Sequence, residues 1–419
     1  MEIGIIGGGA AGIMAAIVSK RSAHFSNVTL IEKNEQIGKK ILVCGAGRCN
    51  LTNRKIKPDR YYGAPKQFIG TVLNQFGSEQ IIDFFENLGI EVYEEEKNGK
   101  RKGKIFPVTN QAATIVELLE SELKRLGVTV LTETEVKTLE YDSSTEKFVV
   151  ETTERELNFD KCILAAGGKT YPNLGATGIG YELAKKFGHT IIEPVPSAIP
   201  LRVDHWLMPR LSGVRITAEV TSIIDGEEVH SDTDEIMFTK FGITGPAILN
   251  ISREISVHIN RENKQNARMR VNVFPGKSFD EVFSLFQDRW FARPDQEVLF
   301  SLYGILPNKF SQTILQFLRI EPTRHNELLT TEEKKQIVQV LQSLEVEVEA
   351  TRTWNEGEFT AGGVFVKEIH PQTMESKIIP NLFLAGEVVN IDGDVGGFNL
   401  SWAWASGYVA GEAVASGVD

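Results

Sequence analysis

The chain is poor in cysteine and has no long apolar run. Its three cysteines among 419 residues, Cys44, Cys49 and Cys162, are too few for a disulfide framework, which indicates a reducing compartment. No apolar run reaches the length of a membrane span, and no basic segment precedes a cleavable apolar one at the N-terminus. We therefore expect a cytoplasmic protein with no membrane partner.

An excess of positive charge is also lacking. The chain has 45 Lys and Arg against 56 Asp and Glu, a formal net charge of -11 at pH 7. Because a nucleic-acid surface needs clustered cations to neutralise phosphates, we expect a small-molecule substrate and no nucleic-acid partner. The seven histidines are scattered and the cysteines lack zinc-ligand spacing, so we expect no metal. The oligomeric state stays open.

Glycine, in contrast, is abundant, with 37 residues, and it clusters near the N-terminus. The apolar run at 3–6 is followed by Gly7, Gly9 and Gly12, and Glu32 closes the next apolar run. In such a strand–turn–helix unit the glycines make the turn, admit a pyrophosphate and let the helix pack on the sheet. The acid can accept ribose hydroxyls and repels a ribose phosphate. A glycine-rich turn alone is a weak signal, but this context predicts FAD or NAD.

Three further glycine-rich segments decide between these two cofactors. One follows a buried strand at 161–164, and a second follows an apolar strand at 381–384. The third, at 393–400, precedes a helix that begins near Ser401. The positive end of that helix suits the electron-rich edge of a reduced flavin. NAD needs no such clamp at the far end of the chain, whereas an extended FAD does, so the sequence favours FAD.

The composition changes in the middle of the chain. Residues 201–256 are rich in short β-type runs, whereas residues 280–341 have helical spacing and a capping pattern at 330–333. Glycine becomes frequent again from about residue 362. We therefore expect an α/β nucleotide-binding domain that is interrupted by an insertion over roughly 196–354.

Three long motifs resemble those of the YhiN/BaiN-like flavoproteins, the aminoacetone oxidase family of NAD(P)/FAD-dependent oxidoreductases. They are CGAGRCNLTN at 44–53, FTKFGITGP at 238–246, and TMESK at 373–377 with GEVVNIDGDVGGFNL at 386–400. The resemblance extends over essentially the whole chain. It implies a discontinuous, glutathione-reductase-like FAD-binding Rossmann domain over 1–195 and 355–419. The insertion would then form a small β-barrel-like domain over 196–275 and 338–354 and a helical domain over 276–337.

The resemblance also implies a set of FAD contacts, and neighbours in the same glycine-rich turns complete the predicted cofactor site. No catalytic residue is assigned. The predicted cofactor-binding residues are Gly7, Gly9, Ala11, Gly12, Glu32, Lys33, Lys40, Gly45, Gly47, Arg48, Cys49, Asn50, Val136, Ala166, Gly167, Gly168, Gly386, Glu387, Asp394, Gly397, Phe398 and Asn399.

Three positions depart from the family pattern: Cys44 replaces the usual Ser, Lys240 the usual His, and Ile179 a common Asp. With Cys49, Cys44 has the spacing of a redox disulfide beside a flavin, but the intervening glycines favour packed thiols in a turn. The turn that contains Tyr171 either places an aromatic ring over a substrate cavity or caps the chain locally.

We expect an FAD-dependent oxidoreductase that exchanges a hydride with a small organic substrate at the flavin. The resemblance suggests both amine oxidation and reduction of an enone-like substrate. The electron acceptor stays open between O₂ and NAD(P)H as a transient co-substrate. One alternative is a non-catalytic FAD-binding redox sensor or interaction protein, and a weaker one is a dithiol–disulfide reductase. The acidic charge balance disfavours a tRNA-modifying flavoprotein.

Overall fold

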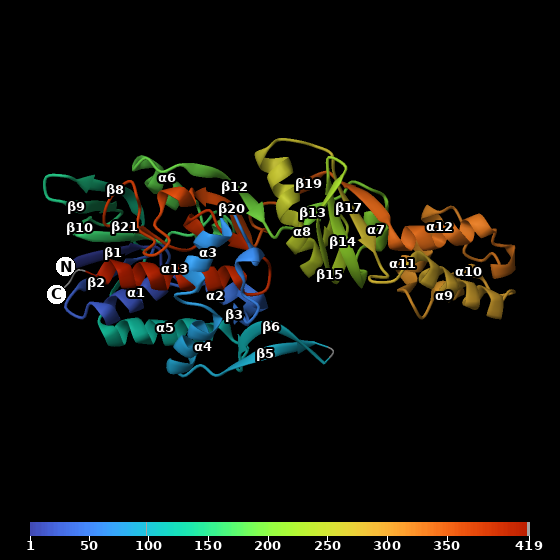
Figure 1. Ribbon diagram of the computed structural model, residues 1–419, viewed down its shortest axis with the longest axis horizontal. Coiled ribbons are helices and arrows are strands. Elements are labelled where there is room, and N and C mark those ends of the chain that lie inside the picture. The colour runs from blue at the N-terminus through green and yellow to red at the C-terminus, as the bar shows by residue number, and fades with distance from the viewer. Residues whose placement is uncertain (98, 417–419) are drawn as a thin grey trace. The chain divides into compact units, whose positions relative to one another are not determined.

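The computed structural model describes residues 1–97 and 99–416. The chain forms two compact units (Figure 1), the first from residues 1–196 and 358–419, the second from residues 197–357. Each unit has its own hydrophobic core. The cofactor motifs at both ends of the sequence belong to the first unit.

A five-stranded parallel sheet forms the centre of the first unit, in the order β21-β11-β1-β2-β7. Its strands are β1 (Glu2–Ile6), β2 (Asn27–Ile31), β7 (Thr129–Leu131), β11 (Lys161–Leu164) and β21 (Leu382–Leu384). The inner strands are apolar and buried because helices cover the sheet. This arrangement confirms the predicted α/β class.

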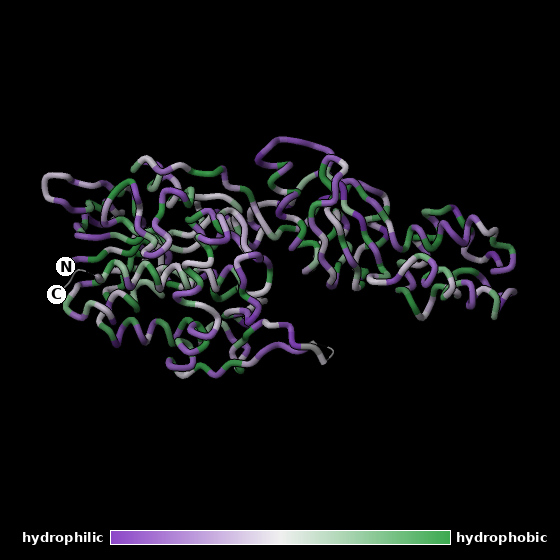
Figure 2. Tube along the Cα trace, in the orientation of Figure 1, coloured by the Kyte–Doolittle hydropathy of each residue, from purple (hydrophilic) through white to green (hydrophobic). Residues whose placement is uncertain are grey.

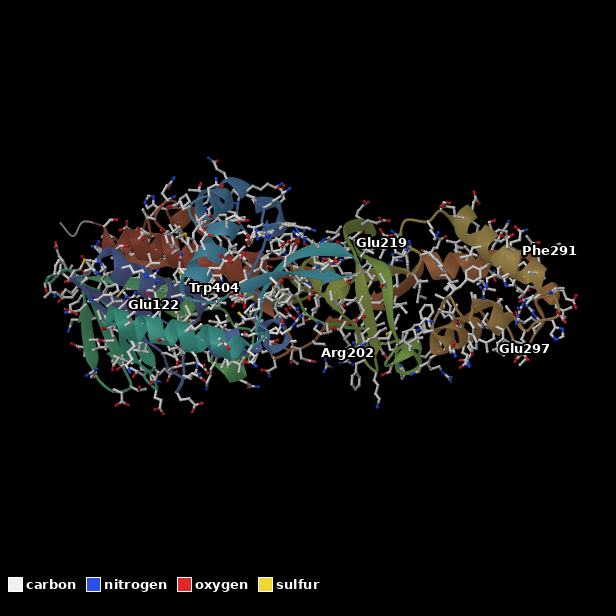
Figure 3. The ribbon with its side chains drawn as sticks, turned by 90° about the horizontal axis from the view of Figure 1, so that it is seen from below. Glu122, Arg202, Glu219, Phe291, Glu297 and Trp404 are labelled. Atoms are coloured by element: carbon white, nitrogen blue, oxygen red, sulfur yellow. The ribbon has the colours of Figure 1, made fainter. Side chains whose placement is uncertain are left out.

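The first and last helices of the chain, α1 (Ala10–Ser22) and α13 (Phe398–Ala415), pack side by side (Figure 1). Glycines on α13 permit the close approach: a Cβ built at Gly407 would lie 2.4 Å from the Ala11 carbonyl oxygen. Trp404 fixes the other side of α13 (Figure 3), where its indole N–H donates to the Leu51 carbonyl at 3.1 Å. The two ends of the sequence therefore share one core.

The remaining elements of the first unit surround this layer. Figure 2 shows hydrophobic residues in its inner elements and mostly hydrophilic ones on the β5–β6 hairpin. These elements are α2 (Lys39–Val43), α3 (Lys66–Leu73), α4 (Ser78–Asn87), α5 (Ala112–Leu126), α6 (Ile179–Lys186), β3 (Thr52–Asn53), β4 (Tyr61–Tyr62), β5 (Val92–Lys97), β6 (Lys100–Pro107), β8 (Val136–Asp142), β9 (Lys147–Thr152), β10 (Glu156–Phe159), β12 (Ile191–Ser197), β20 (Phe359–Val364) and β22 (Asp392–Gly393).

The second unit has a seven-stranded antiparallel sheet, in the order β18-β17-β14-β15-β16-β13-β19, and its own helices. The capping pattern expected at 330–333 is confirmed, since Thr330 Oγ1 accepts the Glu333 N–H at 3.2 Å. Its elements are β13 (Leu201–Arg202), α7 (Leu207–Leu211), β14 (Arg215–Ile224), β15 (Glu227–Thr239), β16 (Gly242–Thr244), α8 (Pro246–Ser256), β17 (Ala267–Asn272), α9 (Phe279–Ala292), α10 (Val298–Leu302), α11 (Asn308–Phe317), α12 (Thr331–Gln342), β18 (Leu344–Val348) and β19 (Ala350–Thr351).

One expectation for this unit is wrong. The β-type character expected up to residue 256 ends earlier, because Pro246–Ser256 is the helix α8. Pro246 lies in the first turn of α8, where its missing N–H removes no hydrogen bond of the helix. Ile248, Ile251 and Ile255 form one buried face at helical spacing. The domain boundaries expected within the insertion stay predictions.

The residues that the structure describes contain no helix long and apolar enough to cross a membrane. In the same part of the chain, no three His, Cys, Asp or Glu side chains are grouped so that they could hold a metal ion.

Candidate cofactor site

Four hollows lie next to one another in the first unit, along the carboxyl ends of its parallel strands, and each shares lining residues with its neighbour; together they are called the trough. We number the hollows from the end at Glu32 to the end at Gly397. The first and second hollows share the lining residues Gly7 and Glu32. Gly9 lines both the second and the third, and Lys40 and Asn399 line both the third and the fourth. Ligands of parallel α/β folds bind at this edge of the sheet, and a trough of this kind suits an extended molecule.

The turn between β1 and α1 forms the floor of the second and third hollows. A Cβ built at Gly12 would lie 1.9 Å from the Gly7 carbonyl oxygen, so the turn and helix require glycine there. A Cβ at Gly9 would meet no described atom within 4 Å, which leaves the backbone open to the hollow. In the described chain no side chain caps α1 at Gly9, so its first N–H groups are available to an anion.

Glu32 is held rigidly at the end of β2. One carboxylate oxygen accepts the Gly8 N–H at 2.8 Å, and the other accepts the Asn34 backbone N–H at 2.8 Å and its side-chain amide at 2.6 Å. The oxygen that accepts the two Asn34 groups has no lone pair left, whereas the oxygen that accepts the Gly8 N–H retains one. The expected contact with a ribose hydroxyl stays a prediction, and it would use this second oxygen. Lys33 and Val136 line the first hollow as well.

An ion pair crosses the middle of the trough. The Lys40 ammonium lies 2.8 Å from the Glu387 carboxylate and 3.0 Å from Thr170 Oγ1. Glu387 also accepts the Thr360 N–H at 2.7 Å. Its carboxylate is thereby fixed beside Gly386, in the single turn that follows β21.

The turn at Cys44–Gly47 has an unusual backbone conformation. Gly45, Ala46, Gly47 and Cys49 have φ values of 57°, 57°, 81° and 61°. The left-handed region is costly for Ala and Cys, and such strain concentrates at functional sites. Beside this turn the buried Asn50 Oδ1 has no hydrogen-bond partner among the described residues, although Asn50 lines the fourth hollow.

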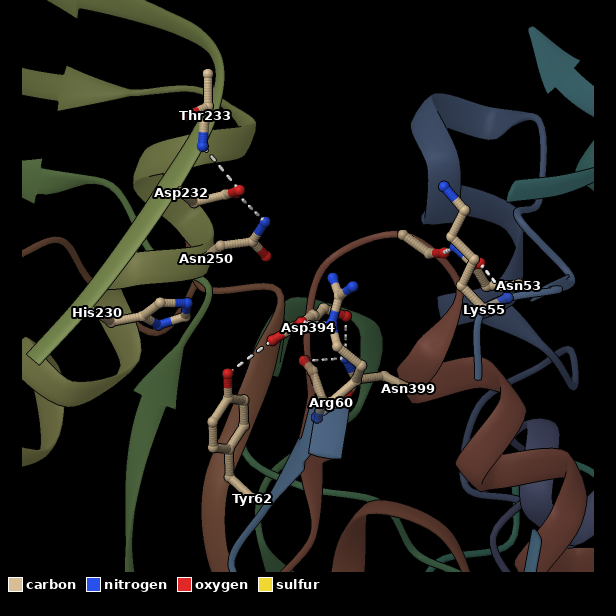
Figure 4. A network of polar contacts seen from close by, with 12 residues as sticks. Asn53, Lys55, Arg60, Tyr62, His230, Asp232, Thr233, Asn250, Asp394 and Asn399 are labelled. Atoms are coloured by element: carbon tan, nitrogen blue, oxygen red, sulfur yellow. Dashed lines mark hydrogen bonds and ion pairs between the residues drawn. The ribbon is translucent and has the colours of Figure 1, made fainter. Parts of the chain in front are cut away.

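A second locked turn precedes α13. The Asn399 side chain accepts the Gly393 N–H at 2.9 Å and donates to the Gly393 carbonyl at 2.7 Å. Figure 4 shows Arg60 and Tyr62 converging on Asp394, where the tyrosine hydroxyl donates to the carboxylate at 2.8 Å. Gly397 is the residue directly before α13; it has φ 99° and lines the fourth hollow.

Most of the predicted cofactor residues line the trough. Two of the exceptions have partners elsewhere: Asp394 is engaged by Arg60, and the Phe398 ring packs on Tyr61 with centroids 5.9 Å apart. The predicted residues that do not line a hollow are Gly12, Gly47, Cys49, Asp394 and Phe398. Their contacts with the cofactor, like those of the lining residues, stay predictions.

Sequence reasoning missed several residues of the fourth hollow. Lys104 and Phe106 lie on β6. Glu358 and Phe359 are the first two residues of the segment 358–419, which belongs to the first unit. None of them belongs to a recognisable motif. Tyr171, which stood as an open candidate, lines this hollow with φ 58°. Of the departures, Ile179 lines the first hollow and Lys240 is an exposed residue of the second unit.

Cys44 and Cys49, in and just after the Cys44–Gly47 turn, are free thiols. Cys44 lines the third and fourth hollows, whereas Cys49 is buried. A hydrogen bond with the Cys44 thiol, and then burial, hold the pKa of Cys49 well above its ordinary value. Because the thiolate is the reactive form, this environment favours packed thiols over a redox pair.

A buried Ser–His–Glu chain lies elsewhere in the first unit. Ser376 Oγ is 2.8 Å from His189 Nε2, and His189 Nδ1 is 3.1 Å from Glu368. The geometry superficially resembles a hydrolase triad, but Ser376 Oγ also accepts the N–H groups of Ile378 and Ile379 at 3.0 and 3.1 Å. Because its oxygen is buried and accepts two backbone N–H groups, Ser376 stabilises a turn and does not act as a nucleophile.

The residues of the trough fit FAD. The uncapped N-terminus of α1 can receive a pyrophosphate, Glu32 can receive a ribose, and the orphaned Asn50 oxygen lacks a donor that a ligand would supply. The uncapped N-terminus of α13 at Gly397 can stabilise negative charge on a reduced flavin.

Comparison with known proteins agrees with this fit. The family model described as HI0933-like protein Rossmann domain matches residues 1–413. The 3-dehydro-bile acid delta(4,6)-reductase of Clostridium scindens is 36% identical over 414 residues, 99% of each chain. The ribosomal RNA dihydrouridine synthase of Haemophilus influenzae is 29% identical over 411 residues, 96% of each chain.

A solved structure shares the fold. The 3-ketosteroid-delta4-(5alpha)-dehydrogenase of Rhodococcus jostii superposes with a TM-score of 0.51 at 16% identity, over 99% of this chain and 97% of the other. The Rossmann fold and the resemblance found in the motifs are therefore confirmed. The chain belongs to the HI0933-like Rossmann family, and it is an FAD-dependent oxidoreductase.

Proposed function

We propose that this enzyme reduces a carbon–carbon double bond conjugated to a carbonyl group in a small organic substrate. FAD supplies the two-electron chemistry when it is bound. The observation that carries the proposal is the trough, which leads from the Glu32 turn to a pocket of polar and aromatic side chains at the fourth hollow. A nicotinamide site alone does not require the third and fourth hollows.

Each part of the trough has a role in this proposal. Glu32 and Val136 hold the adenosine, and the first N–H groups of α1 hold the pyrophosphate. Lys40 and Glu387 bind the ribityl chain, and Asn50 and the start of α13 face the flavin ring. The substrate then occupies the open part of the fourth hollow.

The charge of the fourth hollow favours a carbonyl substrate over an amine. Lys40, Arg48 and Lys104 line it, and Glu358 is the one carboxylate among its described lining residues. Carboxylates behind the lining compensate these cations in part: Glu387 pairs with Lys40, and Glu95 lies 3.3 Å from Arg48 and 3.9 Å from Lys104. Cations attract the oxygen of a conjugated carbonyl as electrons enter the double bond, and they repel a protonated amine. The reductase named among the relatives, at 36% identity, supports the same direction of electron flow.

The decisive experiment is an anaerobic half-reaction study of the purified protein. Its visible spectrum should show bound FAD, and NADH or NADPH should bleach it. Cyclohexenone and a steroid enone with a side-chain carboxylate should then restore the oxidised spectrum, whereas a panel of amines should not bleach it. Fast peroxide formation in air and bleaching by amines would select an amine oxidase instead.

A second candidate is reduction of uracil bases in RNA, as the names of two relatives at 29% and 28% identity describe. The double bond of uracil is also conjugated with a carbonyl, so the chemistry is the same. The net charge of -11 disfavours an RNA surface. Reoxidation of the reduced enzyme by ribosomal RNA, and not by enones, would select this candidate.

A further inference from the structure

Two acidic side chains face the fourth hollow without a protein partner. In the described part of the chain, neither the Tyr171 hydroxyl nor the Glu358 carboxylate makes a hydrogen bond or an ion pair, although both residues are half-buried and line the hollow. Other carboxylates in the trough are engaged: Glu32 accepts three hydrogen bonds, and Glu387 pairs with Lys40. Because no protein group occupies them, both side chains are available to a ligand in the hollow.

The structure holds these two residues together. Thr170 Oγ1 donates to the Glu358 carbonyl at 3.3 Å, which ties Glu358 to the residue that precedes Tyr171. Tyr171 adopts φ 58°, a strained conformation for a residue with a side chain, and the Lys40 ammonium lies 5.9 Å from its ring centroid. Strain of this kind persists where the surroundings fix a side chain in a working position.

The surroundings raise the pKa of both groups above their ordinary values. Burial raises the pKa of Glu358, and this effect outweighs the opposing influence of Lys40 and Lys104. Burial and the nearby Glu358 charge raise the pKa of Tyr171. The other titratable or charged groups that line the hollow are Cys44 and Arg48. The hollow therefore contains a carboxyl group and a phenol that hold their protons more readily than exposed groups do.

We propose that Glu358 is the proton donor of the reduction and that Tyr171 donates a hydrogen bond to the substrate carbonyl oxygen. The inference rests on the proposed function. Saturation of the double bond adds one hydride, which carries two electrons, and one proton. Bound FAD, once reduced by a nicotinamide dinucleotide, would supply the hydride to the carbon farther from the carbonyl group. The proton passes from Glu358 to the carbon beside the carbonyl, and water reprotonates the carboxylate.

The test compares Glu358→Gln and Tyr171→Phe with matched controls outside the trough, Glu140→Gln and Tyr141→Phe, both on β8. Each protein is reduced with dithionite and mixed anaerobically with cyclohexenone and with the steroid enone. We expect Glu358→Gln to slow reoxidation at least about 100-fold and Tyr171→Phe to slow it about 100-fold. Flavin content and reduction by NADPH should stay within about 3-fold of wild type, as should both controls in every assay, because these steps need no proton from Glu358.

Two further readouts report on the proton of Glu358 itself. The wild-type reoxidation rate should fall as pH rises through the pKa of Glu358, and the Gln variant should lose this limb. The flavin-free protein should show an infrared band of a protonated carboxyl at neutral pH that is absent in Glu358→Gln. A variant that loses flavin is replaced by Glu358→Asp, expected to be about 10- to 100-fold slower because its acid is displaced.

The outcomes separate the two proposals. Reoxidation of Glu358→Gln and Tyr171→Phe at the rate of the controls, or a missing carboxyl band, overturns the proton-donor assignment and leaves the reductase proposal standing. If wild-type enzyme is not reoxidised by any enone, the proposed function itself fails, and the assignment fails with it.

Discussion

At its first two hollows the trough is bounded largely by the turns that follow β1, β2 and β11, whereas at the fourth hollow side chains from β6, the Tyr171 turn and Glu358 are added to the turns at Gly45 and Gly397. A nucleotide is common to many enzymes and can be gripped by backbone N–H groups and one acid. A substrate is specific to one enzyme and needs particular side chains in particular places. The two ends should therefore respond differently to substitution.

The largest effect is expected at the backbone end. Gly12→Ala places a methyl group 1.9 Å from the Gly7 oxygen, so the turn and the helix must separate. We expect the free energy of unfolding to fall by about 2–3 kcal/mol, typical of overpacking, and the protein to be isolated without flavin. Denaturant unfolding and the flavin-to-protein absorbance ratio measure the two effects. A stable, fully flavinated variant would show that this turn tolerates a side chain.

Gly9→Ala is the matched control at the same turn. A Cβ there meets no described protein atom within 4 Å, so we expect the free energy of unfolding of the flavin-free protein to change by less than about 1 kcal/mol. The methyl group stands where a pyrophosphate must approach, and FAD affinity should fall about 100-fold, which fluorescence titration of the flavin-free protein measures. Unchanged affinity would place the pyrophosphate elsewhere.

A pH effect on stability should arise outside the trough, at His189. Burial, its largest influence, lowers the pKa of His189 in the folded protein, so the unfolded chain binds the proton more readily. Its contribution to stability is therefore complete above the ordinary His pKa of about 6.5 and is lost as pH falls below that value toward the folded pKa.

We expect the melting temperature to drop by a few °C, roughly, between neutral pH and about pH 5.5, and His189→Gln to remove most of this dependence. An unchanged pH profile in His189→Gln would assign the effect to other groups. The same substitution should leave the reoxidation rate unaffected, because His189 lies outside the lining residues that the structure describes.

The smallest effect is expected from Cys44→Ser. Packed thiols predict a change of less than about 3-fold in flavin reduction and reoxidation, since the raised pKa of Cys49 disfavours a thiolate. Thiol titration before and after mild oxidation should give the same count. Loss of two thiols on oxidation, together with an inactive variant, would restore the dithiol interpretation.

The difference between the two ends also explains what the sequence could predict. The Gly7–Gly12 turn, Glu32 and the helix after them are contiguous or regularly spaced, and each has a local physical reason to be there. Glu358, Tyr171 and Lys104 are far apart in the chain and come together only through tertiary packing, so no local sequence pattern predicts that they share a site. The helix α8 was missed for a similar reason, because short apolar runs of β-branched residues suit both strands and buried helices.

Helix α13 and strand β21 have a consequence for synthesis. On the ribosome, β1 and α1 emerge before the second unit, whereas the strand that completes one side of β11 and the helix that covers α1 emerge after it. The first unit therefore cannot close until the second unit has been synthesised, and we expect the coenzyme to bind only after that point.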